Sequence, residues 1–253
     1  MISANQIYND FEFEINQDYF TANGKKNDLM KRLINKIDDL EKVYKDSYKL
    51  IHFICQYSTP EIIKYIIDNG VDLECQTISK WKPIHFLSRC STPEMIKYMI
   101  DKGVDLECMT ISGFFKPIHV ICKYSTPEMI KYIIDKGVDL ECESFNKRRL
   151  IHLICEFSTP EMIKYIIDKG VNLECETCYK CKPIHLICQY STPEILTYII
   201  DKGVDLESET YFGWKQIHFI LKRGTREMMK LMIEKGVNLH STTSSGVTVL
   251  NRN

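Results

Sequence analysis

The sequence lacks the short motifs by which most nucleotide, metal and catalytic sites are recognised. It has no Gly-x-x-x-x-Gly-Lys loop for phosphates, no Gly-x-Gly-x-x-Gly turn for a dinucleotide, no His-Glu-x-x-His helix and no calcium-binding loop. These absences argue against a nucleotide-dependent enzyme, a zinc peptidase and a calcium sensor. We therefore expect a protein that is not an enzyme and that needs no cofactor.

An excess of charge of one sign is missing too. The 33 Lys and Arg residues nearly balance the 34 Asp and Glu residues, so the formal net charge is -1 and no overall field attracts nucleic acid or acidic lipid. No apolar run reaches the length of a membrane span, and residues 1–10 lack the basic start and apolar stretch of an export signal. We expect a protein that binds neither nucleic acid nor membrane and acts inside a cell, in the cytoplasm.

Cysteine, by contrast, is abundant. Eleven cysteines would suit a small secreted domain held by disulfides, but this chain is long and shows no export signal. Members of one repeat register should lie one packed helix apart, roughly 8–10 Å, which is too far for a disulfide. We therefore expect reduced thiols. The two registers are Cys55, Cys122, Cys155 and Cys188, and Cys75, Cys108, Cys142 and Cys175.

One repeat dominates the sequence. The string Ser-Thr-Pro-Glu begins at Ser58, Ser91, Ser125, Ser158 and Ser191, and a degenerate form begins at Gly224. Successive starts are 33, 34, 33, 33 and 33 residues apart, and a histidine and a glycine recur in step with them. Six copies of one unit indicate a repeat protein in which each unit is stabilised by stacking on the next.

Each unit predicts two helices and a turn. In residues 92–103 apolar residues recur in adjacent pairs four apart, which is typical of an amphipathic helix. Two N-caps are compatible with this helix: Thr92 before Pro93, or Ser91 in a capping box with Glu94. Gly103 suits its C-terminal end. Residues 83–88 predict a short buried helix, and the segment around 111–113 predicts a projecting turn.

At this point the sequence resembles ankyrin repeats. The tetrapeptide Lys-Pro-Ile-His at 82–85, 116–119 and 182–185 corresponds to the family's Thr-Pro-Leu-His, and Gly-Val-Asp at 103–105 corresponds to its Gly-Ala-Asp. The resemblance spans residues 17–251 and implies an all-α ankyrin-repeat solenoid, in which helix-turn-helix units carry projecting β-turn fingers. Two departures bear on the spacing and curvature of the stack: Lys or Arg replaces the family's Thr, and Ile or Leu replaces its first helical Ala.

The period divides the chain into six full repeats, a degenerate N-terminal capping unit and two short ends. We expect a tail at 1–16, the capping unit at 17–49, repeats at 50–82, 83–116, 117–149, 150–182, 183–215 and 216–248, and a truncated end at 249–253. Ile- and Lys-rich segments such as 162–170 are also similar to ankyrin proteins encoded by giant DNA viruses. That resemblance implies a viral protein acting in the cytoplasm of its host.

Three recurring or clustered residue types have a structural explanation beside a functional one. The six histidines repeat identically, whereas a catalytic triad needs unlike partners that meet once; by resemblance they hydrogen-bond a neighbouring turn. A glutamate per repeat, as at Glu74, could attract a basic partner, but we expect it to pair with the Lys or Arg that opens the next unit. Cys178 and Cys181 give a weak zinc signal, since Cys175 and Cys188 beside them belong to repeat registers; we expect no metal.

The ankyrin resemblance implies a non-catalytic module that binds a partner protein through its finger turns and inner helices. The alternative is a substrate adaptor for a host ubiquitin ligase, as in viral ankyrin proteins that carry an added F-box. Residues 1–16 are too short for such a box, and none follows the sixth repeat. Capping at both ends of the stack predicts a monomer.

Two positions of each finger carry large side chains where folding needs only small polar ones. Residues four before each repeat histidine include both tryptophans of the chain, and residues eight after each glycine form a second register. Large aromatic residues and Arg dominate binding hot spots, although each ring could instead pack on the neighbouring turn. We expect partner contacts at Tyr48, Ile78, Trp81, Ile111, Phe114, Phe115, Phe145, Arg148, Tyr179, Tyr211, Phe212 and Trp214.

Four of these residues, Trp81, Phe114, Phe115 and Trp214, are the predicted anchors. The one 34-residue spacing places its extra residue in the finger that contains Phe114 and Phe115. That finger should therefore protrude furthest.

Overall fold

The computed structural model describes residues 34–35, 40–90, 92–111 and 116–249. Across these residues every regular element is a helix, and the β-type pairing there consists of two isolated bridges, Glu209 with Lys215 and Thr242 with Thr248. The predicted all-α fold is therefore confirmed. The elements are η1 (Lys45–Ser47), α3 (Leu50–Tyr57), α4 (Pro60–Asp68), α5 (Pro83–Cys90), α6 (Pro93–Asp101), α7 (Pro117–Tyr124), α8 (Pro127–Asp135), α9 (Leu150–Phe157), α10 (Pro160–Asp168), α11 (Pro183–Tyr190), α12 (Pro193–Asp201), α13 (Gln216–Arg223) and α14 (Arg226–Glu234).

The second helix of each pair begins at a threonine cap. Of the two N-caps compatible with the sequence, the structure has Thr92, with Pro93 as the first helical residue of α6. In α10 the Thr159 hydroxyl accepts a hydrogen bond from the Met162 N–H. The helix ends where Gly170 takes a φ of 82°, a conformation that residues with a side chain rarely adopt. In α14 the cap, Thr225, is retained although Arg replaces Pro after it.

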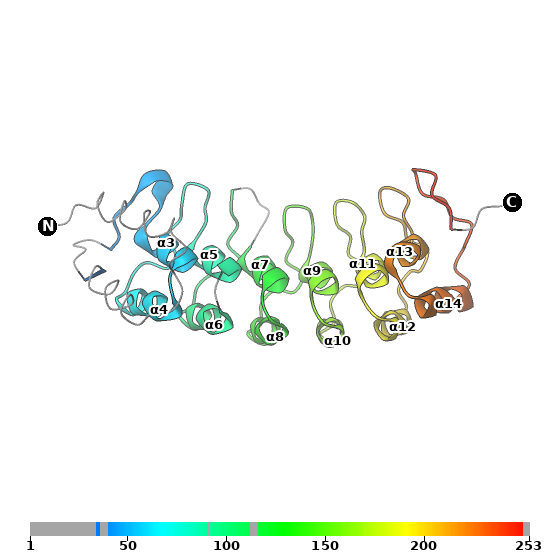
Figure 1. Ribbon diagram of the computed structural model, residues 1–253, viewed down its shortest axis with the longest axis horizontal. Coiled ribbons are helices and arrows are strands. Elements are labelled where there is room, and N and C mark those ends of the chain that lie inside the picture. Colours follow the sequence, from blue (N-terminus) through cyan, green and yellow to red (C-terminus); the bar gives the residue numbers. More distant parts are fainter. Residues whose placement is uncertain (1–33, 36–39, 91, 112–115, 250–253) are drawn as a thin grey trace. The chain divides into compact units, whose positions relative to one another are not determined.

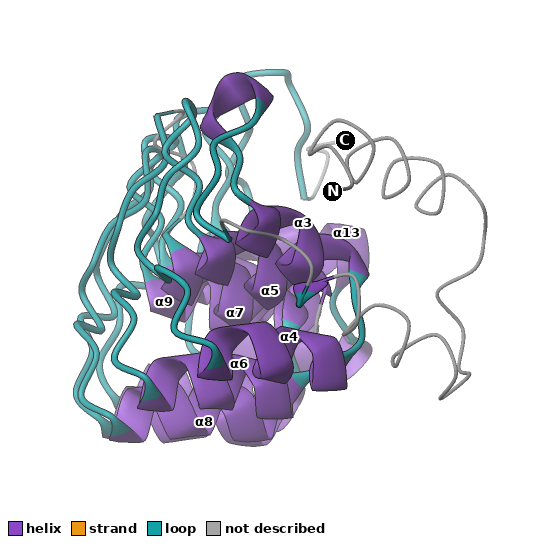
Figure 2. Ribbon diagram, turned by 90° about the vertical axis from the view of Figure 1, so that its left-hand side faces the viewer, coloured by secondary structure: helices purple, strands orange, loops and turns teal. Residues whose placement is uncertain are grey.

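The described residues fall into two units, one ending at Val120 and the other beginning at Ile121. In the second unit α9, α11 and α13 pack side by side as an inner layer, and α10, α12 and α14 form an outer layer (Figure 1). In the first unit α3 and α5 form the inner layer over α4 and α6 (Figure 2). In both units the loops between helix pairs extend beyond the inner layer, and we call these loops the fingers.

The burial pattern explains why the inner and outer helices differ in the spacing of their apolar residues. In α9 every residue from Leu150 to Cys155 is buried, because neighbouring pairs cover it on both sides. The outer helix α10 buries one stripe, Met162, Ile163, Ile166 and Ile167. No helix in the described segments has the length and apolar composition needed to cross a membrane.

Four buried histidines, His52, His152, His185 and His218, each join one helix pair to the next finger. The Nδ1 of His185 accepts a hydrogen bond from the Lys182 N–H at 2.9 Å, and its Nε2 lies 3.1 Å from the Ser208 carbonyl oxygen. Since Nδ1 is an acceptor, Nε2 carries the proton and donates. His52 and His218 make the equivalent bonds. His152 accepts from the Arg149 N–H in the same way, but its Nε2 lies 3.1 Å from the Cys181 carbonyl oxygen, further along the next finger. The predicted structural role of these four histidines is confirmed.

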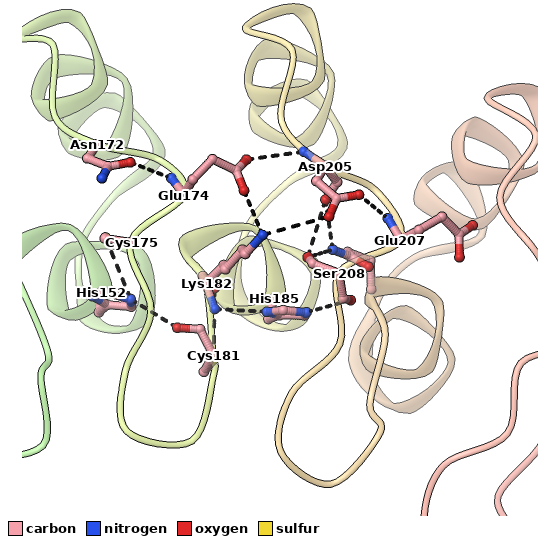
Figure 3. A network of polar contacts seen from close by, with 11 residues as sticks. His152, Asn172, Glu174, Cys175, Cys181, Lys182, His185, Asp205, Glu207 and Ser208 are labelled. Atoms are coloured by element: carbon pink, nitrogen blue, oxygen red, sulfur yellow. Dashed lines mark hydrogen bonds and ion pairs between the residues drawn. The ribbon is translucent and has the colours of Figure 1, made fainter.

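The glutamate ladder forms a second tie between repeats (Figure 3). One carboxylate oxygen of Glu174 lies 2.7 Å from the Lys182 Nζ, as the sequence predicts. Its other oxygen accepts a hydrogen bond from the backbone N–H of Asp205, which belongs to the next helix pair, at 3.1 Å. Glu74 makes the same two contacts, with Lys82 and with the N–H of Asp105. The ladder therefore holds successive repeats together, beyond simple surface pairing.

Replacing Glu174 with Ala should destabilise the second unit by about 1–3 kcal/mol, because the Asp205 N–H and the largely buried Lys182 both lose a partner. Urea unfolding monitored by circular dichroism measures the loss. Glu176→Ala, two residues along in the same finger, is the control and should change stability by less than about 0.5 kcal/mol. Equal effects of the two substitutions would contradict the role given to Glu174.

Stability should fall as the pH is lowered from 7.5 to 5.5. Burial lowers the pKa of His152 and of His185 to about 4, whereas the pKa of a histidine in the unfolded chain is about 6.5. Between these values the unfolded chain binds more protons, so the stabilisation is complete above about pH 6.5 and is lost as the pH falls toward 4. At pH 5.5 each of these two histidines should lower the free energy of unfolding by about 1 kcal/mol relative to pH 7.5, as measured by urea unfolding. An unchanged unfolding free energy at the two pH values would rule this out.

Candidate functional site

The finger tips are short turns held together by a buried hydroxyl. In the tip at 177–181 the Thr177 N–H donates to the Cys181 carbonyl at 3.1 Å, and the Thr177 hydroxyl accepts from the Cys181 N–H at 3.2 Å. The Lys180 N–H closes the turn by donating to the Thr177 carbonyl. Tips 77–81, 210–214 and 243–247 share this hydroxyl bond. The middle residues of each tip are thus not needed to hold the turn.

Neighbouring tips are joined by one backbone hydrogen bond each. In the second unit the Cys178 N–H donates to the Asn146 carbonyl, and the Tyr211 N–H donates to the Tyr179 carbonyl, both at 2.9 Å. In the first unit the Ile111 N–H donates to the Ser79 carbonyl at 2.9 Å. Successive tips of a unit therefore lie in register and present matching side chains beside one another.

Large apolar side chains project from these tips. Six residues, which we call the tip row, have exposed fractions between 55% and 68%: Ile78, Ile111, Phe145, Tyr179, Tyr211 and Phe212. In the second unit the Tyr179 and Phe212 rings stack at 6.3 Å, and Tyr211 lies edge-on to Phe212 at 5.4 Å. An exposed cluster of three rings is unusual unless another molecule covers it. All six belong to the partner contacts expected from the sequence.

Four other predicted contacts, Tyr48, Trp81, Arg148 and Trp214, lie at the base of the fingers. Trp81 is half-buried, with its ring 5.1 Å from the Phe86 ring, and Trp214 packs in the same way on Phe219 at 5.3 Å. The Lys222 ammonium lies over the Trp214 ring. Tyr48 packs on Phe53, and Arg148 pairs with Glu156. Each of these residues directly follows the residue with positive φ that reverses the chain, so its side chain points back to the inner helix.

Two of the four predicted anchors, Phe114 and Phe115, lie outside the described residues. The protrusion expected of their finger therefore stays a prediction. For Trp81 and Trp214 the contacts with the inner helices correspond to the packing alternative considered for this register.

A third row of exposed aromatics was not predicted from the sequence. Tyr124, Phe157 and Tyr190 end the inner helices α7, α9 and α11, with exposed fractions of 55%, 44% and 42%. The Lys123 ammonium lies near the Tyr124 and Phe157 rings, and the Arg223 guanidinium lies over Tyr190. The signal was present, because each of these aromatics directly precedes a Ser-Thr-Pro string.

The cysteines near residues 178 and 181 do not converge on a metal site. Cys178 is exposed at the tip, whereas Cys175 and Cys188 are buried in the core. Burial raises the pKa of Cys175 and of Cys181 to about 11, which disfavours the thiolate that zinc needs. Within the described segments no group of three or more His, Cys, Asp or Glu is placed to hold a metal ion.

Truncating the two kinds of finger residue should have different effects on stability. Trp214→Ala removes a ring that packs on Phe219 and Lys222, and should lower the unfolding free energy by about 2–3 kcal/mol. Tyr211→Ser, at the exposed tip three residues earlier, should change it by less than about 0.5 kcal/mol. Urea titrations of both variants measure the two losses. A larger loss for Tyr211→Ser than for Trp214→Ala would contradict the division of finger residues into tip and base.

Comparison with known proteins agrees with this architecture. The family model for ankyrin repeats, in three copies, matches residues 19–110 and 118–210. No curated protein matches the chain. Among solved structures, the human ASB11 ankyrin-repeat domain is similar with a TM-score of 0.67 and 16% identity, covering 80% of this chain and 90% of that one.

A chain from the complex of the Bd0816 predatory endopeptidase of Bdellovibrio bacteriovorus with the immunity protein Bd3460 is similar with a TM-score of 0.62 and 16% identity. The match covers 77% of this chain and 100% of that one. At such identities the likeness to both solved structures concerns the fold alone. The two segments matched by the family model make up well over half of the sequence, and the chain belongs to the family of ankyrin-repeat proteins.

Proposed function

We propose that the chain is a non-catalytic module that binds a partner protein, and that the tip-row residues of each unit form its principal contacts. Ankyrin repeats are in general protein–protein interaction modules. The observation that carries the proposal is the exposure of six large apolar side chains on the finger tips. Four of them, Ile78, Tyr179, Tyr211 and Phe212, stand on turns that a buried threonine hydroxyl already holds. Folding gains little from these side chains, whereas an interface gains much from them.

The ring cluster of the second unit is the strongest part of this surface. Tyr179, Tyr211 and Phe212 come from two successive fingers and support one another through ring contacts. Rings held in this way lose little conformational freedom on binding, which favours affinity. Trp214 holds the finger that carries Tyr211 and Phe212 in place, because its ring packs on Phe219 of α13.

The location and assembly of the protein are part of the same proposal. The ten cysteines whose side chains the structure describes are free, and reduced thiols persist in a reducing compartment, which supports action inside a cell. We propose that the chain acts there as a monomer. A viral origin and the adaptor role for a ubiquitin ligase are narrower hypotheses, and no observation on the described residues favours either.

Site-specific photo-crosslinking tests the tip row. A benzoylphenylalanine at position 145 or 211 should crosslink one protein from a cell extract, identified by mass spectrometry. The same probe at Thr197, exposed on the outer helix α12, should not. Affinity of the recovered protein should fall at least about 100-fold for the combined Phe145→Ser, Tyr179→Ser, Tyr211→Ser and Phe212→Ser variant, with an unchanged melting temperature.

The control for apolar truncation is Ile233→Ser, which removes an exposed apolar side chain from α14, away from the fingers. It should leave the affinity unchanged. Crosslinking from Thr197 alone, or full affinity in the quadruple variant, would refute the assigned surface. Recovery of ubiquitin-ligase subunits with the quadruple variant would point to the adaptor role at another surface.

A further inference from the structure

Three finger tips carry a lysine at a backbone position that favours glycine. Lys80, Lys147 and Lys180 have positive φ angles of 58°, 56° and 54°. At the equivalent place in two later tips, Gly213 and Gly246 have φ angles of 71° and 83°. The left-handed region is unfavourable for a residue with a Cβ atom and is readily adopted by glycine. The lysines therefore carry a conformational cost that the same turn avoids elsewhere in the chain.

No contact within the described fold explains why lysine stands there. The Gly246 tip shows that glycine is sufficient for this turn. A Cβ added to Gly246 would meet nothing within 4 Å, so glycine stands there because of the backbone conformation and not for lack of space. Lys80, Lys147 and Lys180 are exposed. Their ammonium groups have no hydrogen bond or ion pair with another residue that the structure describes. A contact with another molecule would account for a side chain kept at such a position.

Charge is segregated at the tips. The five tips 77–81, 144–148, 177–181, 210–214 and 243–247 contain these three lysines and Arg148 but no Asp or Glu, in a chain whose net charge is -1. Arg148 is paired with Glu156, so the lysines supply the available positive charge. Each stands two residues from an exposed side chain of the same tip, as Lys147 does from Phe145.

We propose that Lys147 and Lys180 bind carboxylates of an acidic protein segment, whose apolar side chains pack on the tip row of the second unit. The inference rests on the proposed protein-binding function and adds the chemistry of the partner. In the first unit the tip with Lys80 and Ile78 likewise combines an ammonium group with an exposed apolar side chain. Charge complementarity of this kind sets orientation and specificity, while the rings supply most of the affinity.

The register of the fingers defines the spacing of the carboxylates. The tips of Lys147 and Lys180 are adjacent and joined by the hydrogen bond from the Cys178 N–H to the Asn146 carbonyl. One repeat advances the stack by one packed helix, roughly 8–10 Å. An extended peptide advances roughly 3.3 Å per residue, so carboxylates three residues apart match two successive tips. We expect a segment with Asp or Glu at positions i and i+3 and apolar residues near them.

A protein segment fits this surface better than a nucleic acid does. Exposed carboxylates precede the buried Ser or Thr of the tips, at Glu143, Glu176 and Glu209. A continuous polyphosphate lying along the fingers would meet this acidic row, whereas separate carboxylates can match the lysines alone. The aliphatic members of the tip row, such as Ile78 and Ile111, also suit apolar side chains rather than stacked bases.

Peptide selection on the full chain tests the inference. Random 12-residue peptides displayed on phage are selected against the wild type and against the Lys147→Glu, Lys180→Glu variant. Wild-type selections should yield Asp or Glu at i and i+3 beside aromatic or aliphatic residues, and the charge-reversed variant should not recover them. The selected peptide, measured by fluorescence anisotropy, should bind K147A/K180A about tenfold more weakly or worse, and K147R/K180R within about threefold of the wild type.

Glycine variants separate binding from folding. K147G/K180G should lose the same affinity as K147A/K180A, yet its melting temperature should rise by about 2–4 °C, because glycine adopts the left-handed conformation without strain. A purely structural role for the lysines predicts the opposite change in stability and no change in peptide affinity.

Three results would overturn the inference: selections without acidic residues, equal affinity of the acidic peptide for K147A/K180A, or tighter binding of a 20-nucleotide oligo(dT). A neutral or basic consensus that still needs Phe145, Tyr179, Tyr211 and Phe212 would leave the proposed function intact and remove only the acidic partner. Binding that depends on neither set of residues would remove both.

Discussion

The fold depends on pairing polar groups at the place where one repeat ends and the next begins. A helix pair leaves backbone N–H and carbonyl groups at its edges, and stacking buries many of them. Three ties satisfy these groups in the second unit: His185 to the Ser208 carbonyl, Glu174 to the Asp205 N–H, and the Tyr211 N–H to the Tyr179 carbonyl. Apolar burial drives the stacking, and these bonds set its register.

The same ties make the fingers useful for binding. A finger with only its own turn would be a mobile loop, and ordering it on contact would weaken the interaction. Here the base is held by a packed residue such as Trp214, the tip by a buried Thr or Ser, and the flank by the neighbouring finger. The two or three residues left at each tip are free to differ between repeats. Stability and recognition are therefore assigned to different positions of one loop, a few residues apart.

This separation explains which parts of the candidate site were predictable. The register of a position follows from the repeat period alone, so Ile78, Ile111, Phe145 and Tyr211 of the tip row could be predicted from the period. Tyr179 and Phe212 stand one position beyond that register. The direction of a side chain depends on the turn, and the left-handed residue at Lys180 or Gly213 reverses the chain just before Cys181 or Trp214. Both tryptophans consequently pack on the inner helices, and their role as partner anchors stays a prediction. The row of Tyr124, Phe157 and Tyr190 has a clear register, but its exposure depends on where each inner helix ends, which the apolar pattern of these helices does not indicate.

The sequence by itself determined the all-α repeat architecture, the helix pairs and the pairing of Glu174 with Lys182, because each follows from periodicity or from residues close along the chain. The choice of Thr92 over Ser91 as N-cap needed the structure. Only the tertiary structure decided the exposed fraction of each finger residue, the second bond of Glu174 to the Asp205 backbone and the left-handed backbone of the tip lysines. These features arise from the packing of one repeat on the next, or from the closure of a turn around a buried hydroxyl. Neither the packing of repeats nor the closure of the turn can be inferred from the spacing of residue types.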